Sequence, residues 1–185
     1  TYFQCKRCAC LQIRTMPADM SPYYPGNYYS MQTALPRANA AKRVLLGVEA
    51  RTRRHVANRL FGASRRTRIF DWMRGTRVGF DSAILDVGCG RGKLLHELRL
   101  FGFRDLTGAD PFVAESSDSD GVTIHKAELG ALTRQFDLIM MHHTFEHVSD
   151  PAGTLQAAAA RLARDKYLLL RIPVVDCFAW QHYGV

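Results

Sequence analysis

The chain has 185 residues, 47% of them hydrophobic, and its 25 Lys and Arg against 17 Asp and Glu give a formal net charge of +8. This composition excludes a disordered chain and favours one domain with a packed core plus a small appendage. No apolar run reaches the roughly 18 residues of a membrane-spanning helix, so we expect no membrane span. The N-terminus shows no signal-peptide pattern, so we expect a cytoplasmic protein.

The first segment, residues 1–36, is expected to be irregular, because it carries four prolines and no apolar periodicity. Cys5 and Cys8 have the C-x-x-C spacing of a metal knuckle, and Cys10 adds a third thiol. A structural zinc ion needs four ligands, so zinc binding by Cys5 and Cys8 and unpaired surface thiols remain alternatives. The odd total of five cysteines favours reduced thiols.

The second segment, residues 37–79, is expected to be helical. A partly periodic apolar face predicts a helix over 38–60, and Ser64 is placed to cap a second helix that ends at Met73. Much of the excess positive charge lies here, and a basic face can attract nucleic acid or anionic lipid. Aromatic side chains are not interleaved with these arginines, which favours a solvated helix surface.

The third segment, residues 80–185, alternates short apolar runs with helical patterns. Gly102 is placed to end the first of these helices, and Asp150 followed by Pro151 is placed to begin the last. This alternation predicts an α/β fold with a mostly parallel, Rossmann-like sheet and helices on both faces. The chain stops soon after the last run, so we expect the sheet to be truncated after its fifth strand. The predicted strands are 83–87, 106–109, 122–125, 136–141 and 167–172.

A glycine-rich turn joins the first of these strands to a helix, with the sequence DVGCGRG over residues 86–92. Glycines at alternate positions allow a tight turn and a close approach of backbone to a ligand. The spacing differs from the G-x-G-x-x-G pattern that seats a pyrophosphate. Asp86 would repel a pyrophosphate, but it suits a ligand that carries an ammonium group. Asp110 ends the next strand, where a carboxylate can accept hydrogen bonds from a ribose diol.

Three stretches resemble class I S-adenosylmethionine-dependent methyltransferases, over roughly residues 80–175. They are ILDVGCGRG (84–92), GADPF (108–112) and FDLIMMHHTFEHVSDP (136–151), and the last is similar to the branch with an "EHv-dP" signature. Some members of that branch carry an N-terminal zinc-binding segment, and the Cys5–Cys8 pair resembles the second half of its ligand set. Members usually close the sheet with a sixth and seventh strand, which this sequence does not show.

The resemblance implies S-adenosylmethionine as cofactor and assigns residues to its parts. Asp86 would lie near the ammonium and Asp110 on the ribose, while His142 would lie beside the sulfonium methyl. The glycine turn would follow the methionine part, and two further stretches would contact the adenine. The residues of these three stretches are Gly88, Cys89, Gly90 and Gly92 in the turn, Pro111 and Phe112 beside the adenine, and Ala127, Glu128 and Leu129 at its edge.

Polar residues gather after the fourth expected strand, where active-site residues of open α/β folds lie. His143 is the candidate catalytic base for a hydroxyl acceptor. Glu146 and His147 are expected to cap and orient the following loop. Methyl transfer depends mainly on in-line positioning, so a base is not obligatory.

The implied function is methyl transfer from S-adenosylmethionine to a small-molecule or glycan acceptor, because proteins with the EHv-dP block often act on such acceptors. Two alternatives remain. One is a nucleic-acid methyltransferase, favoured by the arginines and disfavoured by the absence of an N-P-P-Y-type block. The other is a non-catalytic interaction module that retains the fold.

Overall fold

The computed structural model describes residues 2–15, 17, 22, 34–36, 38–52, 71–73, 75–174 and 182. Two strands form a hairpin near the N-terminus, and a long helix precedes an α/β sheet. The strands are β1 Tyr2–Gln4, β2 Leu11–Ile13, β3 Ala83–Val87, β4 Asp105–Ala109, β5 Ser117–Ser119, β6 Val122–His125, β7 Phe136–His142 and β8 Leu162–Arg171. The helices are α2 Ala40–Thr52, α5 Lys93–Phe101 and α6 Pro151–Arg161, with 3-10 turns η3 Leu129–Ala131 and η4 Phe145–His147.

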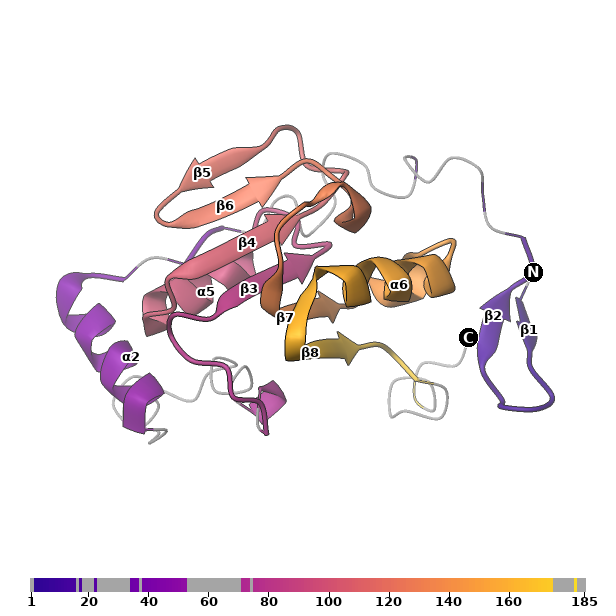
Figure 1. Ribbon diagram of the computed structural model, residues 1–185, viewed down its shortest axis with the longest axis horizontal. Helices are drawn as coiled ribbons and strands as arrows, with labels where there is room; N and C mark the ends of the chain where they lie inside the picture. The colour runs from indigo at the N-terminus through magenta and orange to yellow at the C-terminus, as the bar shows by residue number, and fades with distance from the viewer. Residues whose placement is uncertain are drawn as a thin grey trace.

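Six strands form one sheet in the order β5-β6-β4-β3-β7-β8 (Figure 1). The pairs β6–β4, β4–β3, β3–β7 and β7–β8 are parallel, and only β5 runs antiparallel to its neighbour. Strand β3 lies in the middle, so the strand order reverses on either side of it. The carboxyl ends of β3, β4 and β7 therefore meet at one edge, which is where open α/β sheets bind ligands.

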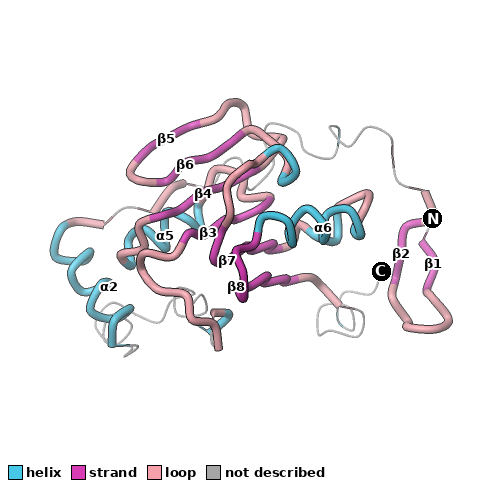
Figure 2. Tube along the Cα trace, in the orientation of Figure 1, coloured by secondary structure: helices cyan, strands magenta, loops and turns pink. Residues whose placement is uncertain are grey.

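Helices cover both faces of the sheet (Figure 2). Successive side chains of a strand point to opposite faces, and the core is divided accordingly. Ile84 of β3 packs with Leu46 of α2 and Leu98 of α5. Leu85, the next residue of β3, packs instead with Ala158 of α6 and Leu129 of η3. The mostly parallel Rossmann-like fold with helices on both faces is thus confirmed.

Local signals in the sequence explain where the two helices of this domain begin and end. Gly102 adopts a left-handed conformation and its N–H donates to the carbonyls of Leu98 and Arg99, which ends α5. The side chain of Asp150 accepts a hydrogen bond from the N–H of Gly153 at 2.9 Å, and Pro151 occupies the first turn of α6. Both predictions are confirmed.

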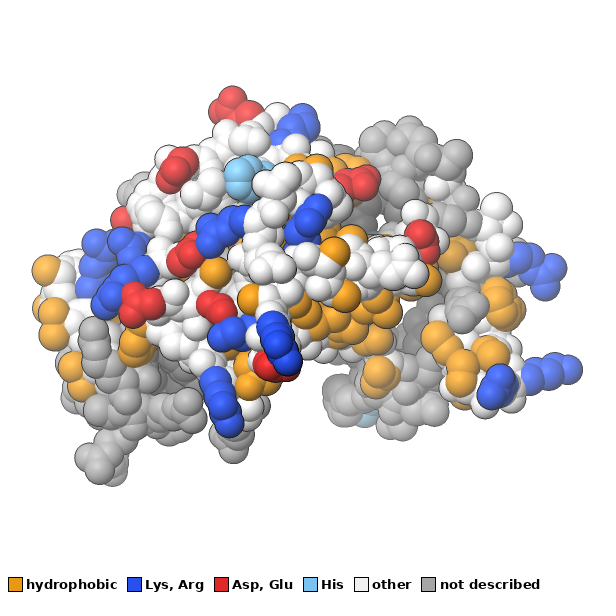
Figure 3. Space-filling view, viewed as in Figure 1, with side chains coloured by type: hydrophobic (Ala, Val, Ile, Leu, Met, Phe, Trp, Pro, Cys, Tyr) orange, Lys and Arg blue, Asp and Glu red, His pale blue; other side chains and the backbone are white. Residues whose placement is uncertain are grey.

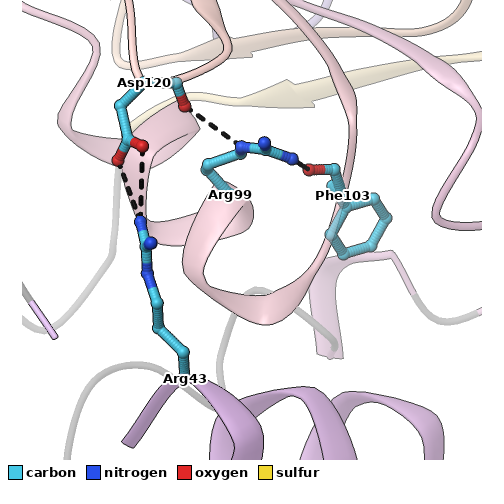
Figure 4. Close-up of polar contacts among 4 residues, drawn as sticks. All are labelled: Arg43, Arg99, Phe103 and Asp120. Atoms are coloured by element: carbon cyan, nitrogen blue, oxygen red, sulfur yellow. Dashed lines mark hydrogen bonds and ion pairs between the residues drawn. The ribbon is translucent and has the colours of Figure 1, made fainter. Parts of the chain in front are cut away.

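An antiparallel hairpin joins the expected strand β6 to β5, which was not expected and extends the sheet by one strand. Asp120 and Gly121 form its two-residue turn, with φ of 51° and 73°. Positive φ at both positions is typical of the type I′ turn that Asp-Gly favours. Arg43 of α2 pairs with the Asp120 carboxylate at 3.1 Å, and Arg99 of α5 donates to the Asp120 carbonyl at 3.0 Å (Figure 4). These contacts attach the hairpin to both helices.

Several expectations differ from the structure in their bounds. The helix expected over 38–60 is observed over Ala40–Thr52, and residues 53–60 lie outside the described part, as does most of the second expected helix. Strand β8 begins earlier than expected, at Leu162, and no strand follows it among the described residues. The segment expected to be irregular contains the β1–β2 hairpin. Within the described residues, no helix has the length and apolar character needed to cross a membrane.

Candidate functional site

The glycine turn lies directly after β3, at the edge where β3, β4 and β7 end. Gly88, Gly90 and Gly92 all have positive φ, at 72°, 54° and 72°. The turn is attached to β4, because the N–H of Gly88 donates to the Ala109 carbonyl at 2.8 Å and the N–H of Gly90 donates to Asp110 Oδ2 at 2.8 Å. Positive φ is readily adopted by glycine, so the backbone itself requires these residues.

Close packing by the chain supplies a second reason for two of the glycines. A Cβ on Gly88 would lie 2.3 Å from Oγ1 of Thr144, and a Cβ on Gly92 would lie 2.7 Å from Cδ1 of Ile124. Sequence reasoning attributed these glycines to the approach of a ligand. The structure shows that the protein's own side chains fill the space that a Cβ at 88 or 92 would occupy.

Asp110 follows β4 and is buried, with 5% of its surface exposed. Its Oδ2 accepts the Gly90 N–H, and its Oδ1 accepts the N–H of Phe112 at 2.9 Å. Each carboxylate oxygen can accept more than one hydrogen bond, so capacity for further donors remains. The two backbone bonds fix the carboxylate plane, so Asp110 is a preoriented hydrogen-bond acceptor at the sheet edge.

Asp86 lies within β3, one strand from Asp110, and is 4% exposed. Burial, and secondly the negative charge of Asp110, raise the pKa of Asp86 to about 8. Among the described residues no cation pairs with its carboxylate. Ionising Asp86 beside the buried charge of Asp110 is costly, and a bound cation would offset that cost. Asp86 is therefore a buried carboxyl whose ionised form lacks a cationic partner among the described residues, and the expected ammonium contact stays a prediction.

The side chain of Cys89 is turned into the protein. A Cβ on Gly108 of β4 would lie 2.5 Å from its Sγ, so the thiol fills the space above that glycine. Burial, and the nearby charges of Asp86 and Asp110, raise the pKa of the Cys89 thiol far above its usual range. A protonated, inward-facing thiol is a poor nucleophile. Only the backbone of Cys89 is placed to line a ligand.

The residues expected around an adenine lie after β4 and β6. Pro111 and Phe112 are exposed beyond the Asp110 carboxylate, and Phe112 retains 41% of its surface. Ala127 is half-buried and Glu128 is exposed after β6. The side chain of Leu129 packs in the second core cluster, which leaves its backbone as the part that can face a ligand.

His142 is the last residue of β7 and its ring is largely enclosed. Its ring centroid lies 4.8 Å from that of Trp72, at an interplanar angle of 43°. Neither ring nitrogen has a hydrogen-bond partner in the described structure, although both are buried. Burial, followed by the charges of Arg171 and His143, lowers the pKa of His142 to about 4. His142 is therefore neutral at physiological pH, with an unused donor and an unused acceptor.

His143 follows directly, in a left-handed conformation with φ of 55°. Its N–H donates to the Arg171 carbonyl at 2.8 Å, and its side chain is 43% exposed with Nδ1 3.5 Å from Glu146 Oε1. Glu146 Oε2 is buried without a hydrogen-bond partner in the described structure. The side chains of His143 and Glu146 thus face one another. From the sequence, Glu146 was expected only to cap and orient the loop that follows β7.

Sequence reasoning did not identify Trp72 or Arg171. Trp72 covers the His142 ring, and the Arg171 guanidinium carbon lies 4.6 Å from the centroid of the Trp72 ring. Arg171 ends an otherwise apolar run of β8, and a charge at that position was a usable signal. Nothing in the sequence around Trp72 indicates that it reaches the end of β7.

The N-terminal cysteines lie at the β1–β2 hairpin. Backbone N–H groups of Cys8 and Arg7 lower the pKa of the Cys5 thiol. No group of three or more His, Cys, Asp or Glu side chains within the described residues is arranged to hold a metal ion. Cys5, Cys8 and Cys10 are free thiols, so these residues do not by themselves supply the four ligands of a structural zinc site.

Comparison with known proteins gives one family, as a family model described as a methyltransferase domain matches residues 48–184. The chain is 40% identical over 50 residues to EEF1A lysine methyltransferase 2 from Homo sapiens, covering 27% of this chain and 21% of that protein. The Danio rerio protein of the same name is 42% identical over 50 residues, covering 27% and 22%. The matched part thus spans about a fifth of these relatives.

Two solved structures share the fold. One is a chain of the complex between the Haloferax volcanii Trm112 methyltransferase activator and a putative methyltransferase, with a TM-score of 0.51, 19% identity, and coverage of 75% of this chain and 66% of that one. The other is a putative methyltransferase from an antibiotic biosynthesis pathway of Anabaena variabilis, with a TM-score of 0.50, 15% identity, and coverage of 62% and 50%. At these identities the likeness shows the fold alone.

Proposed function

Because the chain belongs to the class I methyltransferase-domain family, we propose that it transfers a methyl group from S-adenosylmethionine to a small-molecule or glycan acceptor. The observation that carries the proposal is the pairing of two buried carboxylates, Asp86 and Asp110, beside a backbone turn at the sheet edge. The first suits the ammonium of the cofactor and the second suits its ribose. Asp110 is held by two backbone N–H groups, so it would bind without rearranging.

When bound, S-adenosylmethionine supplies an electrophilic methyl group, which passes to a nucleophilic acceptor atom as the carbon–sulfur bond breaks and S-adenosylhomocysteine is left. The ends of β7 and β8 would hold the acceptor. The ring nitrogen of His143 that does not face Glu146 is Nε2, and it would take the proton of a hydroxyl or amine acceptor. Glu146 would hold the other nitrogen, Nδ1.

The acceptor class is proposed from the EHv-dP block, and other acceptors are kept as alternatives. The curated relatives are lysine methyltransferases, which makes a protein lysine the alternative with the most direct support. A nucleic-acid acceptor is less supported. Most of the arginines that favour it, in residues 53–68, lie outside the described part of the chain, and the described side chains on the face drawn in Figure 3 show basic residues interspersed with acidic ones.

Calorimetric titration with S-adenosylmethionine tests the proposal. Wild type should bind it, and Asp110→Asn should weaken the affinity by about tenfold or more, because a charged hydrogen-bond acceptor is lost. Asp118→Asn, at an exposed position of β5, is the matched control and should leave the affinity unchanged. Equal affinity of wild type and Asp110→Asn would remove the ribose assignment.

A turnover assay separates an enzyme from a binding module. Isotope-labelled S-adenosylmethionine would be incubated with fractions of small polar metabolites, with glycans, with lysine-containing protein and with RNA. Label transfer to the first two fractions supports the proposed acceptor. Transfer to protein or RNA would replace it, and cofactor binding without transfer to any fraction would favour the non-catalytic alternative.

A further inference from the structure

Arg171 lies at the acceptor end of the proposed site. It is the last residue of β8 and pairs in register with His142, the last residue of β7. Its carbonyl accepts the N–H of His143 at 2.8 Å. The backbone of Arg171 is therefore part of the structure that positions both histidines, and its side chain starts from the same strand end.

The positive charge of Arg171 is not neutralised by the described part of the protein. Its guanidinium packs on the face of Trp72, whose ring centroid lies 4.6 Å from Cζ, and no described carboxylate forms an ion pair with it. By contrast, Arg43, Arg104 and Arg134 each pair with an aspartate. The charge of Arg171 acts on its neighbour His142: after burial, it is the second cause of the lowered pKa of that imidazole.

Trp72 fixes the position of the guanidinium. The indole contacts Arg171 and the ring of His142, so both polar groups are ordered around one aromatic side chain. A guanidinium that is already ordered loses less conformational entropy when it binds a planar anion. A fixed guanidinium that has no ion-pair partner among the described residues is suited to a carboxylate.

We propose that the acceptor carries a carboxylate, which Arg171 binds while Trp72 holds the guanidinium in place. This inference rests on the proposed methyl transfer and narrows its acceptor to small anionic molecules. A lysine ammonium at this position would meet the unpaired charge of Arg171, which disfavours the protein-lysine alternative. The carboxylate of the cofactor itself is a second source of the same chemistry, and the test below distinguishes the two.

The binding of benzoate and of its neutral counterpart benzamide tests the proposal. Each would be titrated by NMR into the protein saturated with S-adenosylhomocysteine. Wild type should bind benzoate about tenfold more tightly than benzamide, and Arg171→Met should abolish this preference. Arg171→Lys should retain part of the preference for benzoate, because lysine keeps the positive charge but lacks the planar, two-pronged donor group of the guanidinium. Arg164→Met is the control, since Arg164 is on the same strand and its side chain is 95% exposed.

Three results would overturn the inference: equal binding of benzoate and benzamide by wild type, a preference that survives in Arg171→Met, or loss of the preference in Arg164→Met as well. A titration with S-adenosylhomocysteine and 5′-methylthioadenosine, which lacks the amino-acid part, identifies the source. If Arg171→Met weakens the binding of S-adenosylhomocysteine but not that of 5′-methylthioadenosine, Arg171 binds the cofactor carboxylate and the acceptor assignment is wrong. Failure of wild type to bind S-adenosylhomocysteine would instead refute the proposed function, independently of the benzoate result.

Discussion

Asp86 and Asp110 are buried neighbours at the ends of adjacent parallel strands, and the charge of Asp110 helps to raise the pKa of Asp86 to about 8. In the protein without cofactor, Asp86 therefore keeps its proton at neutral pH while Asp110 holds the glycine turn through the Gly90 N–H. Ionising Asp86 would place a second buried negative charge beside Asp110, and a bound cation would offset the cost of that ionisation. A substitution of Asp86 that raises the free energy of unfolding is therefore expected to weaken cofactor binding.

The substitution Asp86→Asn tests this opposition. The folded carboxyl keeps its proton to about pH 8, whereas the unfolded one loses it near pH 4, so the folded state binds more protons between these values. The contribution of Asp86 to the free energy of unfolding therefore has a negative slope, falling as pH rises through this window in wild type. Asp86→Asn should remove that slope and stabilise the protein at pH 8, yet weaken S-adenosylmethionine binding. Urea unfolding and calorimetry measure the two effects, and an unchanged slope would contradict the assignment.

Gly88→Ala should destabilise the protein by about 1–3 kcal/mol. A left-handed backbone costs an L-residue about 1–2 kcal/mol, and the added Cβ would also overlap Thr144. Combining it with Thr144→Gly should recover the steric part only. Gly130→Ala is the control, because no atom lies within 4 Å of its Cβ position and its φ is not positive. Urea unfolding compares the variants, and equal stability of Gly88→Ala and Gly130→Ala would refute the packing argument.

Asp137 should contribute stability that is lost in acid. The Lys166 ammonium donates to the Asp137 carboxylate at 2.9 Å, and the backbone N–H of Ala83 donates to it at 2.8 Å. Both contacts lower the pKa of Asp137, and the contact with Lys166 has the larger effect. A carboxyl whose folded pKa is depressed stabilises the fold above its unfolded pKa of about 3.9 and loses this effect as pH falls through the folded value. Unfolding curves from pH 6 to pH 2 should show a smaller acid loss in Asp137→Asn than in wild type. An equal loss of stability in acid for wild type and Asp137→Asn would show that the contacts of Asp137 with Lys166 and Ala83 do not stabilise the fold.

His142 should destabilise the protein as pH falls from about 6.5 to about 4. The unfolded imidazole takes up a proton near pH 6.5, while the folded ring resists it until about pH 4, so the contribution of His142 to stability rises with pH across this window. His142→Phe should remove this rising contribution, whereas the opposite contribution of Asp86 and that of the buried His96, whose pKa is also lowered, remain in both proteins. Thermal unfolding at pH 4.5 and 7.5 measures the difference. A profile that remains as steep in the variant would contradict burial of a neutral ring.

The main elements of the sheet were predictable because each carries a local signal. Buried parallel strands appear as short apolar runs, and Gly102 and Asp150 mark helix ends by their own backbone chemistry. Strand β6 was predicted, but its hairpin partner β5 was missed although Asp120-Gly121 is a strong turn signal, because Ser117–Ser119 contains no apolar residue to suggest a strand.

The two carboxylates of the candidate site were predictable for a similar reason, since strand ends and a glycine turn locate them in the sequence. At the acceptor end, the end of the predicted strand located His142 and His143, but Trp72 and Arg171 were missed. Trp72 and Arg171 are about a hundred residues apart and meet only when the helical segment packs beside β7 and β8. The role of glycine at 88 was likewise hidden, because it depends on Thr144, which follows a different strand.

A crystal structure with S-adenosylhomocysteine is the most direct measurement of the central claim. We predict that both ribose hydroxyls lie within hydrogen-bond distance of the Asp110 carboxylate and that the amino group lies beside Asp86. A nucleoside bound away from the edge formed by β3 and β4, with Asp110 contacting only Gly90 and Phe112, would contradict the account.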